Sequence, residues 1–345
     1  MPKSSAITLR HIAEQLGLSR MTVSMALRDS PSVAQATRDR VFRTAEELGY
    51  TRDPIMSSAM ETLRRSAHQR NHVVVAFVTH DPGEAWREVP TLREYHQGIT
   101  ARAEALGFDV QVFSRHEAGV SDRELADLLC ARGIRSLIMA PLPPERMDEQ
   151  IDFPWERFSA VTVGNSLARP AIHRACSNHF HAAETAYARV ADRGYTRIAL
   201  AISKDEDRRS GGKLHGGYLK SQADHGHGPL PAYVPEKWTQ EGFVRWLAET
   251  RPEAVIGLGA SLQPWIESAG KRVPQDIGCA NLSLDARMAA AGLSGIRHLY
   301  VEIGAASLNL LAGALVGNEQ GPPELPTMVD IDGDWHPGNT LRERD

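Results

Sequence analysis

The sequence predicts an α/β protein whose body consists of two doubly wound parallel-sheet subdomains, preceded by a small all-α head of three helices. From residue 72 onward, short apolar runs rich in β-branched residues alternate with amphipathic helical segments, a pattern that builds parallel sheets. Residues 1–70 show only helical periodicity and carry 11 Lys and Arg against 7 Asp and Glu, whereas the remaining 275 residues carry 28 against 36. A basic module on an acidic body is typical of a nucleic-acid-binding head attached to a domain that avoids phosphate.

Three short helices are predicted in the head. The first ends at Gly17, the second runs over residues 20–27 with Ser19 as N-cap, and the third spans 35–48 and stops at Gly49. The apolar residues at the spacing of one buried face are Leu9, Ile12, Ala13 and Leu16 in the first helix, Val23, Ala26 and Leu27 in the second, and Val41, Ala45 and Leu48 in the third. Helices joined by so short a turn form a helix-turn-helix module, whose second helix enters the DNA major groove.

This region resembles the DNA-binding head of the lac repressor (LacI/GalR) family. The resemblance covers the stretch TLRHIAEQLGLSRMTVSMAL, residues 8–27, and the later segments Ser32-Val33, Thr37-Arg38 and Glu46-Glu47-Leu48-Gly49-Tyr50. It implies that hydroxyl side chains hold DNA phosphates and that outward residues of the second helix read base edges. The DNA-binding residues that it implies in the head are Leu9, Arg10, Ser19, Arg20, Met21, Thr22, Ser24, Met25, Arg28 and Thr37.

Two positions of the head depart from the family. Met25 stands where arginine is common, and because methionine cannot make a bidentate contact to guanine, Arg20 is left as the only guanine reader on the exposed face. Met21 and Met25 either contact thymine methyl groups or are merely exposed helix formers, and both interpretations stay open. Ala34 replaces the usual capping hydroxyl, so either Ser32 caps the third helix or its start frays.

Residues 53–70 are interpreted as a hinge helix or linker. Pro54 opens this segment, and good helix formers without a large apolar face follow it. In the family such a segment folds on DNA, where a leucine from each of two copies wedges the minor groove and kinks the duplex. That place falls here at Ala59 and Met60, which complete the predicted DNA-binding set. Ala59 is too small for a wedge, whereas Met60 could serve as a softer one. A flexible tether without minor-groove contact is the alternative.

The elements of the body follow in order along the chain. A capping box, Ser121 to Glu124, opens one helix with Leu125, Leu128 and Leu129 inward. Another helix has Leu92, Tyr95, Ile99, Ala103 and Leu106 along one face, a third has Ala183, Ala186, Tyr187 and Val190 and ends at Gly194, and a fourth contains Trp265. The predicted strands are 73–78, 110–113, 137–140, 161–163, 198–201, 255–258 and 277–280, with a final strand between 333 and 340.

The body resembles the periplasmic-binding-protein-like sensor of the same family. The segments that carry this resemblance are Tyr95-His-Gln-Gly98, Arg193-Gly-Tyr-Thr-Arg-Ile-Ala199, Val273-Pro-Gln-Asp-Ile277 and Glu302-Ile-Gly304. It implies a DNA-binding domain at 1–52 and a body at 71–340 whose chain crosses between subdomains near 171, 295 and 325. The first subdomain would comprise 71–172 and 296–324, and the second 173–295 and 325–340. An effector cleft is expected between them, at the carboxyl ends of strands.

The effector residues of the family are not all present. Leu214 stands where the family usually has an effector-gripping arginine, and Ser283 where it usually has an acid, so a standard sugar pocket is not implied. The candidate effector-binding residues, chosen because they follow strand ends, are Asp81, Tyr95, Asn165, Asn178, Lys204, Arg209, Ser261, Trp265 and Ser283. For each of them an ordinary loop or packing role is an equal alternative, and the helical spacing around Trp265 favours the core.

Other kinds of site find little support. Leu214 follows Gly211-Gly-Lys213, which breaks the phosphate-loop pattern, and the acidic run 330–334 lacks the glycine and the glutamate of a calcium loop. His179-Phe-His181 and His225-Gly-His227 lack further ligands at metal-site spacing, which favours solvated loop histidines. Neither GxSxG nor HExxH occurs, so we expect no enzyme, no cofactor and no metal. Three scattered cysteines and the lack of apolar runs of about 20 residues favour a reduced, cytoplasmic protein without membrane spans.

The sequence therefore predicts a homodimeric transcriptional regulator, with repression as the favoured mode. Its affinity for a pseudo-palindromic operator would be set by a small-molecule effector, a carbohydrate or related metabolite. Dimerisation is implied by the family and by the two half-sites of such an operator. The first alternative is a small-molecule sensor with weak or unkinked DNA binding, and the second is an enzyme built on the α/β body.

Overall fold

The computed structural model describes residues 9–18, 22–23, 26, 34–47, 73–117 and 119–343. Contacts within the chain divide it into two compact units, residues 1–65 and 66–345. The division falls inside the predicted hinge, 53–70. No helix in the described ranges is long and apolar enough to cross a membrane.

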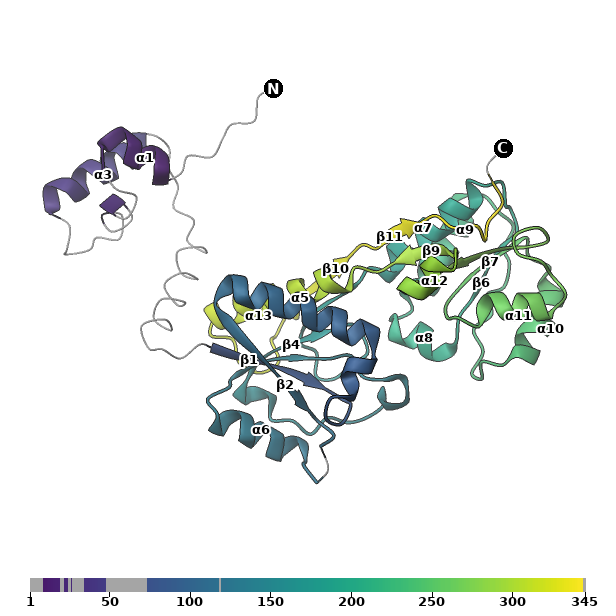
Figure 1. The fold of residues 1–345 in the computed structure, drawn as a ribbon, viewed down its shortest axis with the longest axis horizontal. Helices are drawn as coiled ribbons and strands as arrows, with labels where there is room; N and C mark the ends of the chain where they lie inside the picture. Colours follow the sequence, from purple (N-terminus) through teal and green to yellow (C-terminus); the bar gives the residue numbers. More distant parts are fainter. Residues whose placement is uncertain are drawn as a thin grey trace. The chain divides into compact units, whose positions relative to one another are not determined.

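The head contains helices α1 (Leu9–Leu16) and α3 (Gln35–Glu47), drawn in purple in Figure 1. α1 ends at Gly17, whose φ of 67° is the left-handed conformation that glycine adopts without a steric penalty. Inward residues of the two helices pack with described residues of the segment between them, as the apolar spacing predicts. The resulting small core consists of Ile12, Ala13, Val23, Ala26, Val41 and Ala45.

Most of the predicted DNA-binding residues lie outside the described residues. They are Ser19, Arg20, Met21, Ser24, Met25, Arg28, Ala59 and Met60. Leu9 and Arg10 begin α1, but only their backbone belongs to the described structure. Thr22 and Thr37 are half-buried, with Thr37 in the first turn of α3.

The first lobe of the body is a six-stranded sheet in the order β10-β5-β4-β3-β1-β2, with every neighbouring pair parallel. Helices α5 and α13 lie on one face and α6 on the other (Figure 1). The strands are β1 (Val73–Thr79), β2 (Phe108–Ser114), β3 (Ser136–Met139), β4 (Ser159–Val163), β5 (His173–Ser177) and β10 (Met328–Ile331). The helices are α5 (Pro90–Leu106), α6 (Asp122–Ala131) and α13 (Tyr300–Val316), with short 3₁₀ turns η1 (Ala85–Glu88), η2 (Pro144–Arg146) and η3 (Trp155–Arg157).

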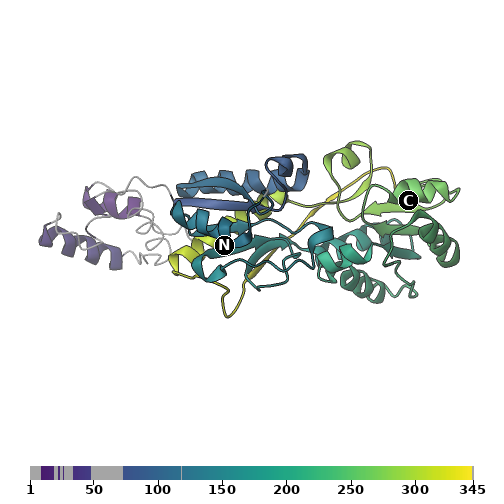
Figure 2. The same cartoon turned by 90° about the horizontal axis from the view of Figure 1, so that it is seen from below.

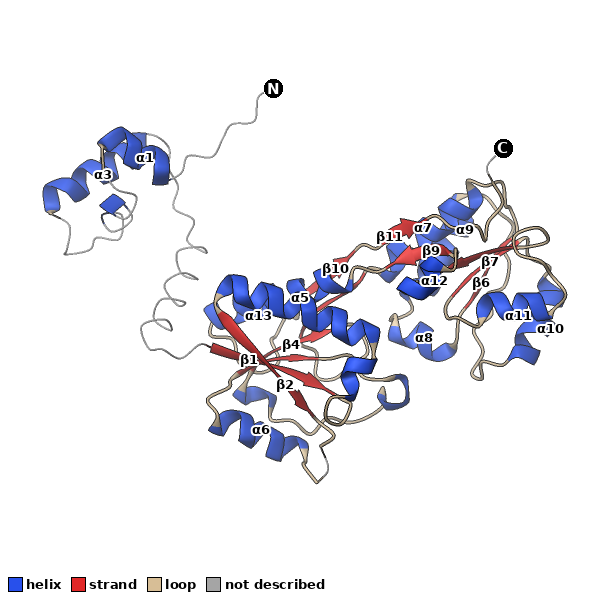
Figure 3. Cartoon of the chain, viewed as in Figure 1, coloured by secondary structure: helices blue, strands red, loops and turns tan. Residues whose placement is uncertain are grey.

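The second lobe is a five-stranded sheet in the order β11-β9-β8-β7-β6, in which only the β11–β9 pair is antiparallel. Figure 3 shows the strands of each lobe flanked by helices, the layering of a doubly wound sheet. The strands are β6 (Ile198–Ala201), β7 (Ala254–Gly257), β8 (Gly278–Asn281), β9 (Ser294–Arg297) and β11 (Asp334–His336). The helices are α7 (His179–Ala191), α8 (Lys204–Arg209), α9 (Lys213–Asp224), α10 (Gln240–Thr250), α11 (Leu262–Ser268) and α12 (Ala286–Ala290).

The chain crosses between the lobes three times, and two crossings differ from the expected places. β5 pairs with β4 and therefore belongs to the first lobe, so the first crossing follows Ser177 rather than residue 171. β10 pairs with β5, which moves the third crossing from about 325 to the residues after Ile331. The second crossing follows Arg297, close to the expected 295. In Figure 2 the yellow C-terminal segment can be followed from one lobe into the other.

β5 was missed because its sequence, HRACS, has no β-branched residue and no apolar alternation. β5 is a strand because it pairs with β4 on one side and β10 on the other, and these pairings depend on the sheet rather than on local propensity. Sequence periodicity also gave no prediction for α10 or for the long helix α13, which is apolar on most sides.

The predicted capping box at the start of α6 is confirmed. The Ser121 hydroxyl accepts from the Glu124 backbone N–H at 3.3 Å, and Glu124 Oε2 accepts from the Ser121 backbone N–H at 2.9 Å. Leu125 and Leu129 are buried, but Leu128 is 41% exposed, so its predicted inward position is wrong. Leu128 lies one residue before Leu129, and the narrow face of α6 that meets the sheet cannot include both.

α5 and α13 cross at two glycines, Gly98 and Gly304, where the backbone of one helix contacts the backbone of the other. A Cβ on Gly98 would lie 1.8 Å from the carbonyl oxygen of Val301, and one on Gly304 would lie 2.2 Å from the carbonyl oxygen of Tyr95. No side chain fits at either place, so the helices approach as closely as their backbones allow. This crossing fixes the position of Tyr95 on α5 relative to Tyr300 at the start of α13.

Candidate functional site

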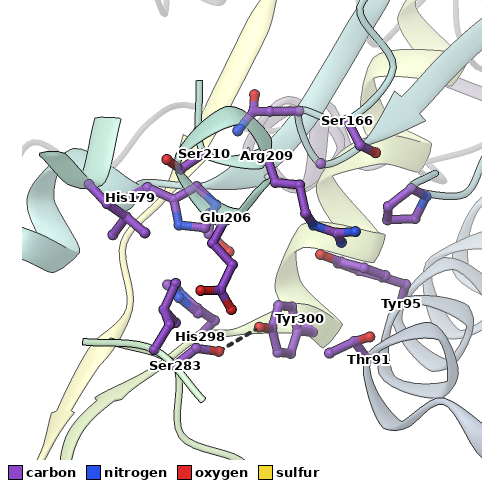
Figure 4. Close-up of a pocket in the computed structure, with 16 residues that line it drawn as sticks. Thr91, Tyr95, Ser166, His179, Glu206, Arg209, Ser210, Ser283, His298 and Tyr300 are labelled. Atoms are coloured by element: carbon purple, nitrogen blue, oxygen red, sulfur yellow. Dashed lines mark hydrogen bonds between the residues drawn. The ribbon is translucent and has the colours of Figure 1, made fainter. Parts of the chain in front are cut away.

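A cavity of about 200 Å³ lies between the two lobes of the body (Figure 4). Its walls come from the loops that follow strand ends and from the first turns of helices, the region where doubly wound sheets bind ligands. The residues that line it are Thr91, Tyr95, Pro141, Gly164, Asn165, Ser166, Ser177, His179, Glu206, Arg209, Ser210, Leu214, Leu258, Ser283, His298 and Tyr300.

The short helix α8 brings two opposite charges to this cavity. Ser203 caps α8, and its backbone N–H and hydroxyl both donate to Oε2 of Glu206, at 3.2 Å each. Arg209 stands about one turn later, at the last residue of α8, and its Nη1 donates to the carbonyl oxygen of Leu142 in the first lobe at 3.1 Å. Beside it, Arg208 forms an ion pair with Asp148, which also belongs to the first lobe. α8 is therefore both a wall of the cavity and a bridge between the lobes.

Two tyrosines from the first lobe form another wall. The rings of Tyr95 and Tyr300 meet edge to face with centroids 5.3 Å apart, the arrangement that aromatic quadrupoles favour. The Tyr300 hydroxyl lies 3.1 Å from the hydroxyl of Ser283, which follows β8 in the second lobe. The cavity thus offers ring surface together with hydroxyl groups that can donate or accept.

Two histidines, His298 buried and His179 half-buried, face each other between the lobes. The rings of His179, at the start of α7, and His298, after β9, are nearly perpendicular, with centroids 5.3 Å apart. Burial lowers the pKa of His179 to about 3 and that of His298 to about 4, so both rings are neutral at pH 7. The ring nitrogen Nδ1 of each is buried without a hydrogen-bond partner among the described residues.

Three residues that line this cavity carry unpartnered polar atoms. The buried atoms Asn165 Nδ2, His179 Nδ1 and His298 Nδ1 have no hydrogen-bond partner among the described residues. Buried polar groups are almost always paired, so their clustering in one hollow indicates a place for a ligand or for bound water.

Four of the nine candidate effector residues line the cavity: Tyr95, Asn165, Arg209 and Ser283. The other five have other positions. Asn178 caps α7 and donates to Asp332, Ser261 accepts from the indole N–H of Trp238, and Trp265 packs on Trp238 with ring centroids 5.2 Å apart, in line with the packing role that its spacing favours. Asp81 and Lys204 are half-buried and do not line the cavity.

Sequence reasoning missed four side chains with functional chemistry here: His179, Glu206, His298 and Tyr300. The interpretation of His179 as a solvated loop histidine is wrong, because His179 begins α7 and its ring packs against that of His298, with Nδ1 buried. The signal for Glu206 was a second capping box, Ser203 to Glu206, which matches the one found at α6. His298 and Tyr300 follow a crossing, and no local pattern marks a crossing.

The buried histidines give a pH dependence of stability. Because the folded-state pKa of His298, about 4, lies below the ordinary 6.5, the unfolded chain takes up the proton more readily between these values. The free energy of unfolding is therefore expected to fall as pH drops from about 6.5 toward 4, by up to about 1.4 kcal/mol per pH unit for this histidine. When urea unfolding is measured at several pH values in this range, the free energy of unfolding should depend less steeply on pH in a His298→Gln variant. An equal pH dependence in the two proteins would contradict this expectation.

Comparisons with known proteins agree along the chain. Residues 8–53 match the family described as bacterial regulatory proteins, lacI family, and residues 187–331 match the periplasmic binding protein-like domain. The HTH-type transcriptional repressor CytR of Escherichia coli (strain K12) is 24% identical over 92% of this chain and 93% of its own. The repressor PurR of Erwinia tasmaniensis is 20% identical over 94% of this chain and 95% of its own.

Solved structures share the fold over nearly the whole length. A complex of the transcriptional regulator CelR with cellobiose has a TM-score of 0.58 at 19% identity and covers 97% of this chain and 99% of that one. The lac repressor dimer bound to operator and the anti-inducer ONPF has a TM-score of 0.54 at 17% identity, and the match covers 98% of this chain and 100% of that one. The head therefore matches the lacI family of bacterial regulatory proteins, the body matches the periplasmic binding protein-like domain, and relatives that are transcriptional repressors align along more than 90% of the chain.

Proposed function

We propose that the protein is a sequence-specific DNA-binding transcriptional regulator, acting as a repressor, whose operator affinity is set by a small molecule bound between the lobes of the body. The observation that carries this proposal is the joining of a lacI-family head to a body whose inter-lobe cavity holds three unpartnered polar atoms. The relatives named above are repressors, which supports the sign of regulation. Their common character as regulators also supports binding rather than turnover.

A homodimer on a pseudo-palindromic operator is part of the proposal. One small head makes few contacts, and two half-sites one helical turn apart multiply its affinity. The lac repressor structure that matches this chain is a dimer on operator, which supports the same arrangement here. The basic head then faces phosphate while the acidic body stays clear of it.

The expected result is operator binding that weakens steeply with salt. Against a duplex selected from a random pool, the logarithm of the affinity should fall linearly with the logarithm of salt concentration, because bound Lys and Arg release counterions. Arg20→Ala is expected to raise the dissociation constant about 5- to 150-fold at a guanine-containing site, the loss of about 1–3 kcal/mol. Fluorescence anisotropy measures both effects.

A matched control is available in the body. Arg245 is exposed on α10 and paired with Glu241, so Arg245→Ala should leave the dissociation constant for DNA unchanged. Salt-insensitive binding, or equal losses in the Arg20→Ala and Arg245→Ala proteins, would contradict the DNA-binding role of the head.

Ala59, at the place of the family's leucine wedge, favours a second form of the same function, in which the operator is bound without a kink. The family wedge is a leucine, and a methyl group cannot open a base step. In this form the regulator binds operator without kinking it, and the gel mobility of circularly permuted operator fragments distinguishes the two. Uniform mobility of the permuted fragments would favour the unkinked complex.

For the effector we propose a carbohydrate or related metabolite of about the size of one sugar ring. The cavity of about 200 Å³ lies below the roughly 300–1,000 Å³ typical of sites for drug-sized ligands. Structures of similar fold hold cellobiose and glucose, which supports this class. A ligand at 100 times its dissociation constant should stabilise the protein by about 2.7 kcal/mol.

A further inference from the structure

The walls of the inter-lobe cavity carry no net charge. Among the described residues that line it, Glu206 is the one acid and Arg209 the one base. His179 and His298 add no positive charge at pH 7 because burial lowers the pKa of each ring. The remaining lining groups are hydroxyls, an amide and apolar surface, so the cavity has no excess of positive charge for an anion.

The two charges form no ion pair with each other. Among the described residues Glu206 takes part in no ion pair, and its carboxylate accepts from the backbone N–H and the hydroxyl of Ser203. One guanidinium nitrogen of Arg209 is already occupied by the carbonyl of Leu142. In Figure 4 the Glu206 carboxylate points into the space between the lobes. A carboxylate or phosphate entering this space would lose its water and meet Glu206 at close range.

The unpartnered atoms define what an uncharged ligand must offer. The backbone carbonyl of Leu282 takes the hydrogen bond of the His298 ring, and Nδ1 is the nitrogen that remains without a partner. In a neutral imidazole with one N–H, the other nitrogen is an acceptor, so Nδ1 requires a donor from the ligand. Asn165 Nδ2 is a buried donor without a partner and requires an acceptor. His298 itself is only 7% exposed, so water satisfies it poorly from outside.

We propose that the effector of this cavity is an uncharged molecule that gives a hydrogen bond to His298 and accepts one from Asn165, and that Glu206 excludes its anionic analogues. This inference rests on the proposed function, since it assumes that the cavity is the effector site. It separates uncharged sugars and nucleosides, whose hydroxyls and amides both donate and accept, from sugar acids, sugar phosphates and nucleotides. It also makes Glu206 and His298 specificity-determining residues.

The test uses the full chain and matched pairs of probes. Uncharged monosaccharides, disaccharides and nucleosides are each compared with a carboxylate or phosphate counterpart, for example glucose with gluconate and with glucose 6-phosphate, by thermal shift and then by calorimetric titration. We expect every hit to be uncharged and its anionic counterpart to bind at least about tenfold more weakly. An anion that binds as tightly as its uncharged counterpart would overturn the inference.

Glu206→Gln is expected to remove the selectivity against anions. Glutamine serves equally well at this place of a capping box, so α8 keeps its N-terminal hydrogen bonds. The variant should bind the anionic counterpart at least about tenfold more tightly than the parent does, because the repelling charge is gone. Glu124→Gln, the same change in the exposed capping box of α6, is the matched control and should change neither affinity. Equal behaviour of the two variants counts against Glu206.

His298 is tested by two substitutions. His298→Phe removes the acceptor and should weaken the uncharged hit by about tenfold or more, because the ligand donor is left unpaired. His298→Asn can present its amide oxygen near the place of Nδ1 and should recover part of the affinity. Salt-dependent operator binding is measured for each protein as the check on folding.

The two proposals fail in different ways. If no probe stabilises the protein while operator binding persists, the inference about the cavity is overturned and the DNA-binding function stands. If uncharged probes bind with the expected selectivity but no duplex does, the regulatory function falls and the chemistry of the cavity remains.

Discussion

Replacing Arg115 by methionine is expected to lower the free energy of unfolding by about 3–5 kcal/mol, because it leaves two partly buried carboxylates without their cation. The Arg115 side chain is 2% exposed. Its guanidinium donates to both oxygens of Asp122, at 2.8 and 2.7 Å, and to Glu149 at 2.9 Å. Its Nη1 also lies 3.2 Å from Nδ1 of His80, whose other nitrogen is 3.0 Å from the Ala140 carbonyl oxygen.

This network joins the ends of β1 and β2 to the start of α6 and to the loop that carries Asp148, the partner of α8 across the cavity. The expected loss is a large part of the 5–15 kcal/mol typical of a folded domain. Chemical unfolding measures it, with operator affinity at low temperature as the functional readout. Methionine keeps much of the length of the arginine side chain, so most of the loss comes from the unpaired carboxylates.

Arg123, which lies on α6 next to Asp122, is the matched control for Arg115. It makes an equally regular pair with Asp152, at 2.8 and 3.0 Å, but the two side chains are 71% and 70% exposed. Water replaces such a partner readily, so Arg123→Met should leave the free energy of unfolding nearly unchanged. Comparable losses in the two variants would show that burial does not govern the energetics of this network.

Gly304→Ala and Gly98→Ala are expected to destabilise the body by about 3 kcal/mol each, the upper end of the usual cost of overpacking. Each added methyl group would lie within 1.8 to 2.2 Å of a backbone carbonyl oxygen, and backbone cannot rotate away as a side chain does. The helices must separate, which displaces Tyr95 and Tyr300 from the cavity wall. Effector affinity should therefore fall together with the midpoint of thermal unfolding.

Gly313 provides the opposite expectation on the same helix. A Cβ at this place has no heavy atom within 4 Å, so Gly313→Ala should stabilise α13 by up to about 1 kcal/mol through helix propensity alone. Destabilisation by all three alanines would contradict the contact argument, since only two of the glycines lie at the crossing.

The sequence predicted what depends on local pattern. The capping box at Ser121, the stop at Gly17 and the apolar face of α5 are each determined within one or two turns, and the structure confirms them. β5 and β10 depend instead on a neighbouring strand that lies far away in the sequence, and both crossings next to them were misplaced. Strand pairing across more than 150 residues leaves no signal in the periodicity of a single segment.

The candidate site divides in the same way. Asn165 and Ser283 follow predicted strands, so the rule that ligands bind at strand ends found them. His179 follows β5, a strand that the pattern did not predict, and was therefore misread as a loop histidine. Its ring packs against that of His298, which the chain brings close only at the second crossing. Asn178 and Lys204 also follow strands but do not line the cavity, because a position near a strand end does not decide which way a side chain points.

The order of the crossings also determines when each lobe can finish folding during synthesis. β10 and β11 are separated by only a few residues, yet one completes the sheet of the first lobe and the other completes that of the second. α5 likewise leaves the ribosome long before its partner α13, because nearly all of the second lobe is made between them. Neither sheet can therefore be complete before residues 328–336 emerge, and the part of α5 that packs against α13 stays uncovered during most of translation, a period in which exposed apolar surface favours aggregation.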